Sequence, residues 1–275
     1  MPALRAGPMI GPMDAPPEGT VERWAWDYVT SRELAHKLAP PPVPERWELD
    51  PPPRRLDAPG RPPELVRTDR RAKTPGPEAL RDPRRRAELL HTFFHHELQA
   101  AELMLRAMLL FSDREPAFRR GLVRIALDEV RHMGAYAEHL RALGSHVGAF
   151  PVRDWFWERV PAADDPIAFV ALLGIGFEGA NLDHTRRFAE RFRAVGDEEG
   201  ARLQEIVGEE EIPHVKFATH WLERWTGAIS FDAWLERLPA PLSPIVMRGK
   251  PLDRARRARA GLDDAFLDAL ESWEP

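Results

Sequence analysis

Four long segments of the chain each carry a glutamate inside an apolar helical stripe, and this feature restricts the fold more than any other. In residues 83–111, Phe94, Ala101 and Met108 recur at helical spacing, and Glu97 occupies a position in the same stripe. The other three segments, residues 116–143, 166–195 and 198–225, contain Glu129, Glu178 and Glu211 in equivalent positions. An apolar stripe faces the core of a helical protein, so the sequence predicts an all-α fold with four buried carboxylates.

Two of the glutamates are followed three residues later by a histidine. The string DEVRH contains Glu129 and His132, and EEIPH contains Glu211 and His214. Residues i and i+3 share a helix face, so each pair directs a carboxylate and an imidazole to one point. A single Glu-x-x-His usually lies on a solvated face or in a helix ion pair. Two of them on apolar stripes, each preceded by a core-facing glutamate at almost the same interval, indicate one shared site.

The spacing of the glutamates places them at one level of a helical bundle. Asp113 lies in the turn between the first two segments, and Glu97 precedes it by the same interval by which Glu129 follows it. At about 1.5 Å per residue, both glutamates lie about 24 Å from that turn. Glu178 follows Glu97 at almost the same offset at which Glu211 follows Glu129. The second pair of segments therefore repeats the first, which indicates an internal duplication.

The charge of this cluster predicts bound metal. Four unpaired buried carboxylates would cost several kcal/mol each or would become protonated. Two divalent cations would neutralise four carboxylates, and ligands of this type suit iron or manganese better than zinc. The chain has no cysteine, which excludes thiolate sites. We therefore predict two metal ions per chain, most simply iron and alternatively manganese, with the ligands Glu97, Glu129, His132, Glu178, Glu211 and His214.

The ligand pattern resembles a known superfamily. One glutamate from each of two helices plus Glu-x-x-His from each of two others is similar to the ferritin-like di-iron carboxylate proteins, over about residues 85–225. DEVRH also resembles the D-E-x-R-H segment of the ribonucleotide reductase small subunit and of bacterial multicomponent monooxygenases. The strings HELQAAEL, DEVRHMGAYAEHLRALG and EEEIPHVKFATHW look closest to a bacterial ferritin-like family of undetermined function. The resemblance implies a ferritin-like four-helix bundle, in which Asp128 and Glu210 accept hydrogen bonds from the ligand histidines.

Three further side chains are candidates for a supporting role near the metals. Glu102 and Asp183 each follow a predicted ligand, Glu97 or Glu178, by five residues, which turns them about 140° away from it. Direct ligation is therefore not expected, and a supporting or a surface position remains open for both. Tyr136 lies one turn beyond the first histidine, either beside the metals or in the core packing.

Pro213 lies between the ligands of the last long segment. Inside a regular helix a proline removes one hydrogen bond and costs about 3 kcal/mol. We therefore predict a kink or a π-bulge between Glu209 and His214. His139 and His220 are expected at the surface or in an interface, and the segment around Trp155 is expected to pack the long connection before the third helix or to form a lid.

The remainder of the chain flanks this bundle. Most of the 28 prolines lie in residues 1–83, and residues 1–82 are expected to form an arm that wraps over the domain or over a second subunit of a homodimer. A short helix capped by Thr20 is expected in the arm. The arginine-rich stretch 70–86 is either a solvated linker or an anion-binding patch. Residues 83–226 form the bundle, and residues 227–275 form an extension with helices near 231–238 and 252–272.

Composition narrows the function. The net charge of −5 does not indicate the basic surface that a nucleic-acid-binding protein usually has. Neither a membrane span nor a secretory leader is recognisable, so we expect a cytoplasmic protein. We expect a dioxygen-activating oxidase or oxygenase with a small organic substrate and an electron donor as partner. A ferroxidase, peroxide-scavenging or iron-handling protein is one alternative, and a non-catalytic scaffold stabilised by metal is another.

Overall fold

The protein is all-α in the part of the chain that the structure describes. The computed structural model describes residues 15–70 and 75–275, and within these ranges every regular element is a helix apart from one isolated β-bridge between Arg67 and Val152. The expectations about a leader at the start of the chain and about residues 70–86 rest in part on residues outside the described ranges.

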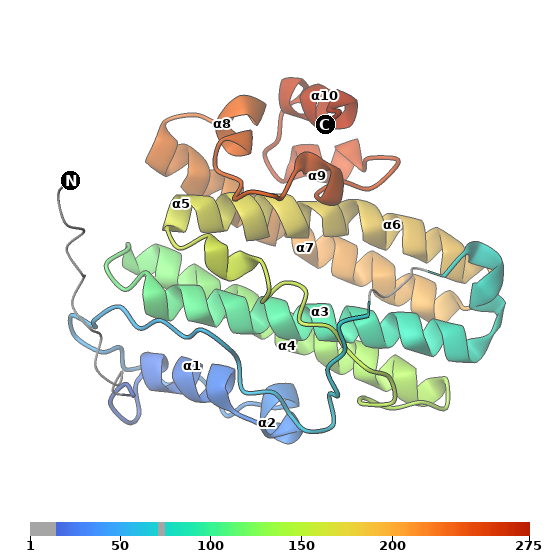
Figure 1. Ribbon diagram of the computed structural model, residues 1–275, viewed down its shortest axis with the longest axis horizontal. Helices are drawn as coiled ribbons and strands as arrows, with labels where there is room; N and C mark the ends of the chain where they lie inside the picture. The colour runs from blue at the N-terminus through green and yellow to red at the C-terminus, as the bar shows by residue number, and fades with distance from the viewer. Residues whose placement is uncertain (1–14, 71–74) are drawn as a thin grey trace, which may run out of the picture.

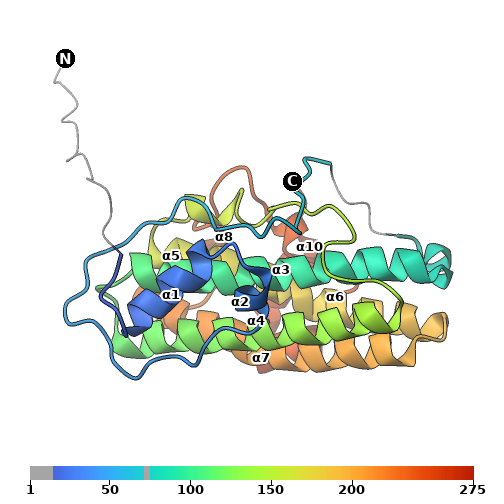
Figure 2. The same cartoon turned by 90° about the horizontal axis from the view of Figure 1, so that it is seen from below.

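Four long helices form the centre of the molecule (Figure 1). They are α3 (Pro83–Leu110), α4 (Pro116–Ala142), a composite helix of α5 (Pro166–Phe169), η3 (Val170–Glu178) and α6 (Gly179–Ala194), and α7 (Glu198–Thr226). The helices α3 and α4 form one antiparallel hairpin, and α6 and α7 form a second one beside it (Figures 1 and 2). The predicted bounds are confirmed to within one residue at each end.

Local sequence fixes where these helices begin. Asp82 accepts a hydrogen bond from the backbone of Arg84, and Asp165 accepts two, from Ile167 and Ala168. A proline occupies the first turn of α3, α4 and α5, where its missing N–H group is not needed. Asp197 caps α7 through the backbone of Gly200.

The irregular backbone lies in a different helix from the one predicted. The helix α7 runs as a continuous α-helix through Pro213, so the predicted π-bulge there is wrong, and the alternative, a kink, stays a prediction. Pro213 is exposed, and the carbonyl of Glu209 that loses its partner can therefore bond to water. The π-helix is instead η3, all nine residues of which are buried and which ends on Glu178.

The N-terminal arm covers the hairpin of α3 and α4 (Figure 2). It contains α1 (Val21–Thr30) and α2 (Leu34–Leu38), and the Thr20 hydroxyl caps α1 by accepting from the backbone of Arg23, as predicted. Trp24 and Tyr28 are buried against the core, whereas Leu49 is 88% exposed and does not take part in the packing. A short 3-10 helix, η1 (Pro77–Arg81), leads into α3.

The C-terminal extension packs on the second hairpin (Figure 1). It consists of α8 (Phe231–Leu235), η4 (Pro244–Val246), α9 (Arg254–Arg259) and α10 (Asp264–Ser272). The single helix expected over 252–272 is two helices, because Gly261 has a φ of +96° that ends the first and Asp263 caps the second. The indole N–H of Trp234 donates to the carbonyl of Ala171 in η3 and so fixes the extension to the core.

The connection between α4 and α5, which includes η2 (Val160–Ala162), runs along α3. The Gln99 side chain accepts from the backbone of Phe156 and Trp157, and Trp155 packs 4.9 Å from Phe177. The aromatic stretch therefore packs this connection onto the core. Within the described residues one helix, residues 166–194, is long and apolar enough to cross a membrane, but 78% of its apolar window is buried in the protein, as in a core helix.

Candidate metal centre

Six side chains converge between the four long helices. All are at most 4% exposed, and they come from α3, α4, η3 and α7: Glu97, Glu129, His132, Glu178, Glu211 and His214. One ligand atom from each of four of them lies within 4.8 Å of the others, namely from Glu97, Glu129, His132 and Glu211. The register predicted from the symmetric spacing therefore brings these side chains to one level.

The carboxylate of Glu129 lies between the two imidazoles. Its Oε2 is 3.1 Å from Nδ1 of His132, and its Oε1 is 3.1 Å from Nδ1 of His214. Glu211 mirrors this arrangement, with one oxygen 2.9 Å from Nδ1 of His214 and the other 3.8 Å from Nδ1 of His132. Glu97 and Glu178 lie close enough to Glu129 and Glu211 for the charges of these two carboxylates to raise the pKa of each.

The outer nitrogens of the histidines contact a crossed pair of carboxylates. Nε2 of His132 on α4 lies 2.8 Å from Glu210 on α7, and Nε2 of His214 on α7 lies 3.2 Å from Asp128 on α4. These are the two residues that the resemblance implied as acceptors. An imidazole that donates its Nε2 hydrogen to a carboxylate presents the lone pair of Nδ1 inward, which is the state in which it binds a metal.

Arg131 joins the two outer carboxylates. Its guanidinium donates to Asp128 at 2.6 Å and to Glu210 at 2.9 Å, at the partly exposed contact between α4 and α7. One arginine therefore positions the acceptors of both histidines. The sequence reasoning missed this residue, although it lies three residues after Asp128 and so on the same helix face.

The buried carboxylates of the cluster repel one another. Burial raises the pKa of Glu97 and of Glu178 well above the usual value, and the charges of Glu129 and Glu211 raise it further. Burial lowers the pKa of His132, but the hydrogen bond and the charge of Glu129 outweigh burial and raise this pKa to about 9. Protons thus neutralise the site where no other cation does so.

The donor atoms fit divalent cations. Oε1 of Glu178 is buried and has no hydrogen-bond partner among the described residues. Buried carboxylate oxygens normally have a hydrogen-bond partner. Carboxylate oxygens together with imidazole nitrogens are a donor set that suits iron or manganese. Asn181, three residues after Glu178, donates to Glu211 at 3.0 Å and was also missed from the sequence.

Tyr136 is buried in the core next to this site. Its hydroxyl accepts a hydrogen bond from Gln204 at 2.9 Å, and its ring packs 5.9 Å from Phe93. Burial raises its pKa well above 10, and the charge of Glu97 raises it further. Tyr136 is therefore a core residue that lies close enough to Glu97 for the charge of Glu97 to affect its pKa.

Glu102 is a buried anchor for the N-terminal arm, so the surface position left open for it is wrong. Its carboxylate lies 2.8 Å from Nζ of Lys37, accepts two hydrogen bonds from Arg61 at 2.9 and 3.0 Å, and accepts a third from the indole of Trp157 at 2.8 Å. The side chains of Lys37 and Glu102 are fully buried. Four donors from other segments thus hold a single carboxylate on α3.

Asp183 anchors the C-terminal extension in the same manner, and a surface position is wrong for it too. Arg257 donates to it at 3.0 and 2.8 Å, and the backbones of Gly249 and Asp253 donate at 2.7 Å each. His139 also differs from the expectation: it is buried and contacts Asp197, whereas His220 is exposed as expected.

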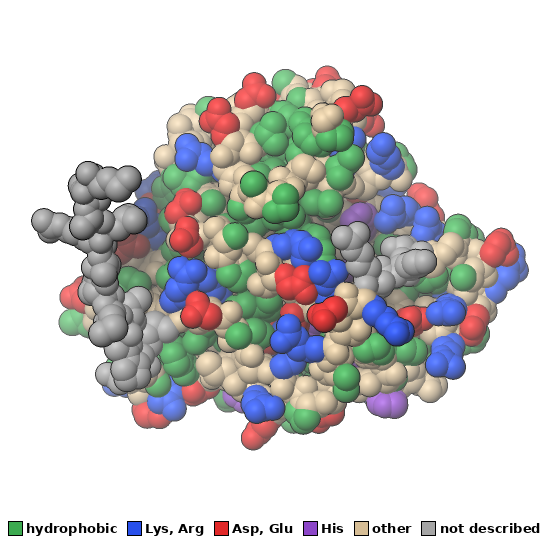
Figure 3. Space-filling model, viewed as in Figure 1, with side chains coloured by type: hydrophobic (Ala, Val, Ile, Leu, Met, Phe, Trp, Pro, Cys, Tyr) green, Lys and Arg blue, Asp and Glu red, His purple; other side chains and the backbone are tan. Residues whose placement is uncertain are grey.

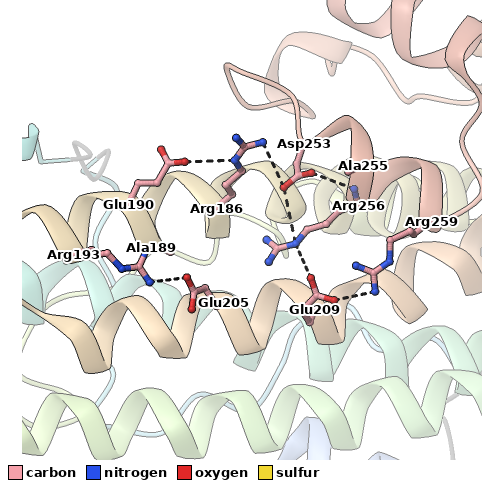
Figure 4. A pocket seen from close by; sticks show the side chains of 10 residues that line it. All are labelled: Arg186, Ala189, Glu190, Arg193, Glu205, Glu209, Asp253, Ala255, Arg256 and Arg259. Atoms are coloured by element: carbon pink, nitrogen blue, oxygen red, sulfur yellow. Dashed lines mark hydrogen bonds and ion pairs between the residues drawn. The ribbon is translucent and has the colours of Figure 1, made fainter.

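A surface hollow lies apart from the candidate metal centre, between α6, α7 and α9 (Figure 4). It has a volume of about 350 Å³, and its charged side chains are paired: Arg193 with Glu205 at 2.7 Å, and Arg256 and Arg259 with Glu209 at 3.1 and 2.9 Å. Acidic and basic groups also alternate over the face shown in Figure 3.

Sequence comparison places the chain in a family. The family model described as "Protein of unknown function (DUF455)" matches residues 21–268. The chain belongs to the DUF455 family. An uncharacterized protein of Haemophilus influenzae (strain ATCC 51907 / DSM 11121 / KW20 / Rd) is 29% identical to this DUF455 protein over 155 residues, which is 54% of each chain. The chain therefore spans about half the length of that relative, and no solved structure matches.

Proposed function

We propose that this DUF455 protein is a ferritin-like di-metal carboxylate protein that uses two iron ions, or manganese in their place, to activate dioxygen and oxidise a small organic substrate. The observation that supports it is the convergence of two Glu-x-x-His pairs and two further glutamates in one buried cluster. The two oxygens of Glu129 each lie 3.1 Å from an imidazole, so the groups that would hold the metals are adjacent. An electron donor is expected as a partner.

The ligands would be Glu97, Glu129, His132, Glu178, Glu211 and His214. Four carboxylates match the charge of two divalent cations, which would relieve the raised pKa values of Glu97 and Glu178. When bound, the metals would supply the electrons for dioxygen reduction.

The surrounding protein positions these groups. Asp128 and Glu210 fix the two imidazoles, Arg131 holds both carboxylates, and Asn181 orients Glu211. Oε1 of Glu178 is a buried carboxylate oxygen that remains without a hydrogen-bond partner in the described chain and lies on the π-helix. This oxygen therefore has a lone pair left that would hold a proton or a metal ion.

Anaerobic loading with ferrous iron, followed by metal analysis after gel filtration, tests the site. We expect two iron ions per wild-type chain and fewer in the double variant Glu129→Ala with Glu211→Ala. Glu138→Ala is the matched control, because Glu138 lies on the same helix α4 but is exposed. A double variant that still binds two ions per chain would refute the assignment.

Exposure of the loaded protein to dioxygen then distinguishes the reactions. An oxidase or oxygenase requires an external reductant and an organic substrate for repeated turnover. Oxygen consumption that ferrous iron alone sustains would replace this proposal by a ferroxidase. Loaded protein that does not react with dioxygen or peroxide would instead be a metal-stabilised scaffold.

A further inference from the structure

The contact between α4 and α7 is open to solvent beside the cluster, and the two helices lie side by side along one edge of the bundle (Figure 2). On α4, Leu127, Arg131 and Gly134 follow one another at i, i+4 and i+7, and all three are exposed. On α7, Ile206 and Pro213 are separated by the same interval and are exposed too. Residues at this spacing share one face of a helix, so water reaches this contact along both helices.

The other sides of the bundle are covered by the rest of the chain. The N-terminal arm lies on the hairpin of α3 and α4, and the C-terminal extension lies on the hairpin of α6 and α7. The connection between α4 and α5 packs along α3 through Gln99, whose side chain accepts from the backbone of Phe156 and Trp157. An ion that approaches through the contact between α4 and α7 therefore crosses none of these three layers.

Two carboxylates link this exposed contact to the buried histidines. The side chain of Glu210 is 38% exposed and lies 2.8 Å from Nε2 of His132. The side chain of Asp128 is 28% exposed and lies 3.2 Å from Nε2 of His214. The histidines themselves are 2% exposed. Carboxylate oxygens suit divalent cations, so these two groups form a step between solvent and the predicted ligands.

Arg131 occupies the outer end of this step. Its guanidinium donates to Asp128 at 2.6 Å and to Glu210 at 2.9 Å, so it fills the position between the two carboxylates that an arriving cation would take. Its positive charge also repels such a cation. The arginine side chain is 57% exposed, and an exposed ion pair contributes little to stability, so the guanidinium can turn into water without disturbing the core.

We propose that divalent metal ions enter the cluster between α4 and α7 and that Arg131 gates their entry. When the guanidinium turns outward, Asp128 and Glu210 present two negative charges to the cation and pass it to the histidines behind them. When the guanidinium turns back, it restores the contacts that hold both imidazoles. This proposal rests on the proposed function, because the cluster has to bind metal, and it adds the route of entry and the residue that sets the rate.

The rate of cobalt uptake tests the gate. Stopped-flow absorbance records the entry of Co²⁺ into the full-length, metal-free protein, since the visible spectrum of the ion changes when carboxylate and imidazole ligands replace water. Arg131→Ala should accelerate uptake about 10-fold, because the entrance loses a positive charge and the group that fills it. Equilibrium binding should at the same time become weaker. If the arginine only positioned the carboxylates, its loss would weaken binding without accelerating uptake.

Arg141→Ala is the matched control, because it removes the same charge from an exposed position on the same helix, and it should leave the uptake rate unchanged. The absence of cysteine from the chain allows a second test. In Arg131→Cys the introduced thiol can be modified with either an aminoethyl or a hydroxyethyl group. The cationic product should take up Co²⁺ as slowly as the wild type, and the neutral product as rapidly as Arg131→Ala.

The gate and the metal function fail in different ways. Unchanged or slower uptake by Arg131→Ala, at the metal content of the wild type, would overturn the gate and leave the metal centre intact. Equal uptake rates of the two modified proteins would overturn the gate as well. Wild-type protein that binds neither cobalt nor iron would refute the metal function itself, and the gate with it.

Discussion

Glu102→Gln on α3 should destabilise the protein more than removal of its partner Lys37 in the arm. The substitution preserves side-chain volume, but it leaves the fully buried Lys37 facing a neutral amide, whereas Arg61 keeps its ion pair with Asp154. Removing one partner of a buried ion pair costs about 3–5 kcal/mol, because the remaining charge is uncompensated. We therefore expect the free energy of unfolding to fall by about 3–5 kcal/mol.

Lys37→Met provides the comparison from the other side of the pair. In this variant Glu102 keeps Arg61 and Trp157, so no charge is left unpaired. The carbonyl of Tyr28 loses the lysine as its donor, which costs about 1–3 kcal/mol, whereas the carbonyl of Val29 keeps the backbone N–H of Gly60. The arm should consequently tolerate loss of the lysine better than loss of the glutamate.

Urea denaturation followed by tryptophan fluorescence and circular dichroism measures these differences. The matched control is Glu88→Gln on the same helix, whose exposed pair with Arg85 should contribute less than about 1 kcal/mol. Iron content of Glu102→Gln should equal that of the wild type if the role of Glu102 is to anchor the arm. The reasoning is refuted if Glu102→Gln costs less than Lys37→Met, or no more than Glu88→Gln.

Three other predictions concern the metal centre and its surroundings. Arg131→Ala should weaken iron binding by about 10-fold or more in chelator competition, because Asp128 and Glu210, which position the histidines, lose the arginine that holds them. Arg141→Ala, at an exposed position on the same helix, should leave iron binding unchanged. Equal effects of the two substitutions would contradict this role of Arg131. Metal binding near neutral pH should release protons, because the metal displaces the proton that His132 holds with its pKa of about 9. The apparent metal affinity should therefore rise with pH. Calorimetry in buffers of different ionisation enthalpy would detect the proton release, and metal binding that is independent of pH would argue against it. Burial lowers the pKa of His91 to about 4, so between pH 6.5 and 4 the unfolded chain binds the extra proton and stability should fall by up to about 3 kcal/mol as the solution is acidified. Urea midpoints at both pH values, with His91→Gln as the less pH-sensitive variant, test this; identical slopes for the two proteins would refute it.

The long helices and the level of the cluster were predictable because their determinants are local. Prolines and aspartates mark the first turns, and equal spacing of Glu97 and Glu129 about one turn fixes their register. The resemblance in addition predicted Asp128 and Glu210 beside the histidines, although whether the cluster binds metal stays a prediction.

Other features depend on tertiary surroundings that the sequence does not display. The cost of Pro213 depends on whether water reaches the freed carbonyl of Glu209, and the exposed face of α7 allows it. The π-helix 170–178 is buried on all sides, so its apolar residues show no period from which an extra residue per turn could be read. The partners of Glu102 and Asp183 lie 41 and 74 residues away in the sequence, beyond the reach of helical spacing.

The two anchors have a consequence for the chain ends. Glu102 follows Glu97 by five residues, and Asp183 follows Glu178 by five, yet their arginines come from opposite ends of the chain. Each terminal segment thus serves as the counter-ion of the helix that it covers. A protein shortened from either end would retain its four long helices but would contain a carboxylate with no positive charge to neutralise it. The appendages are therefore part of the electrostatic balance of the core.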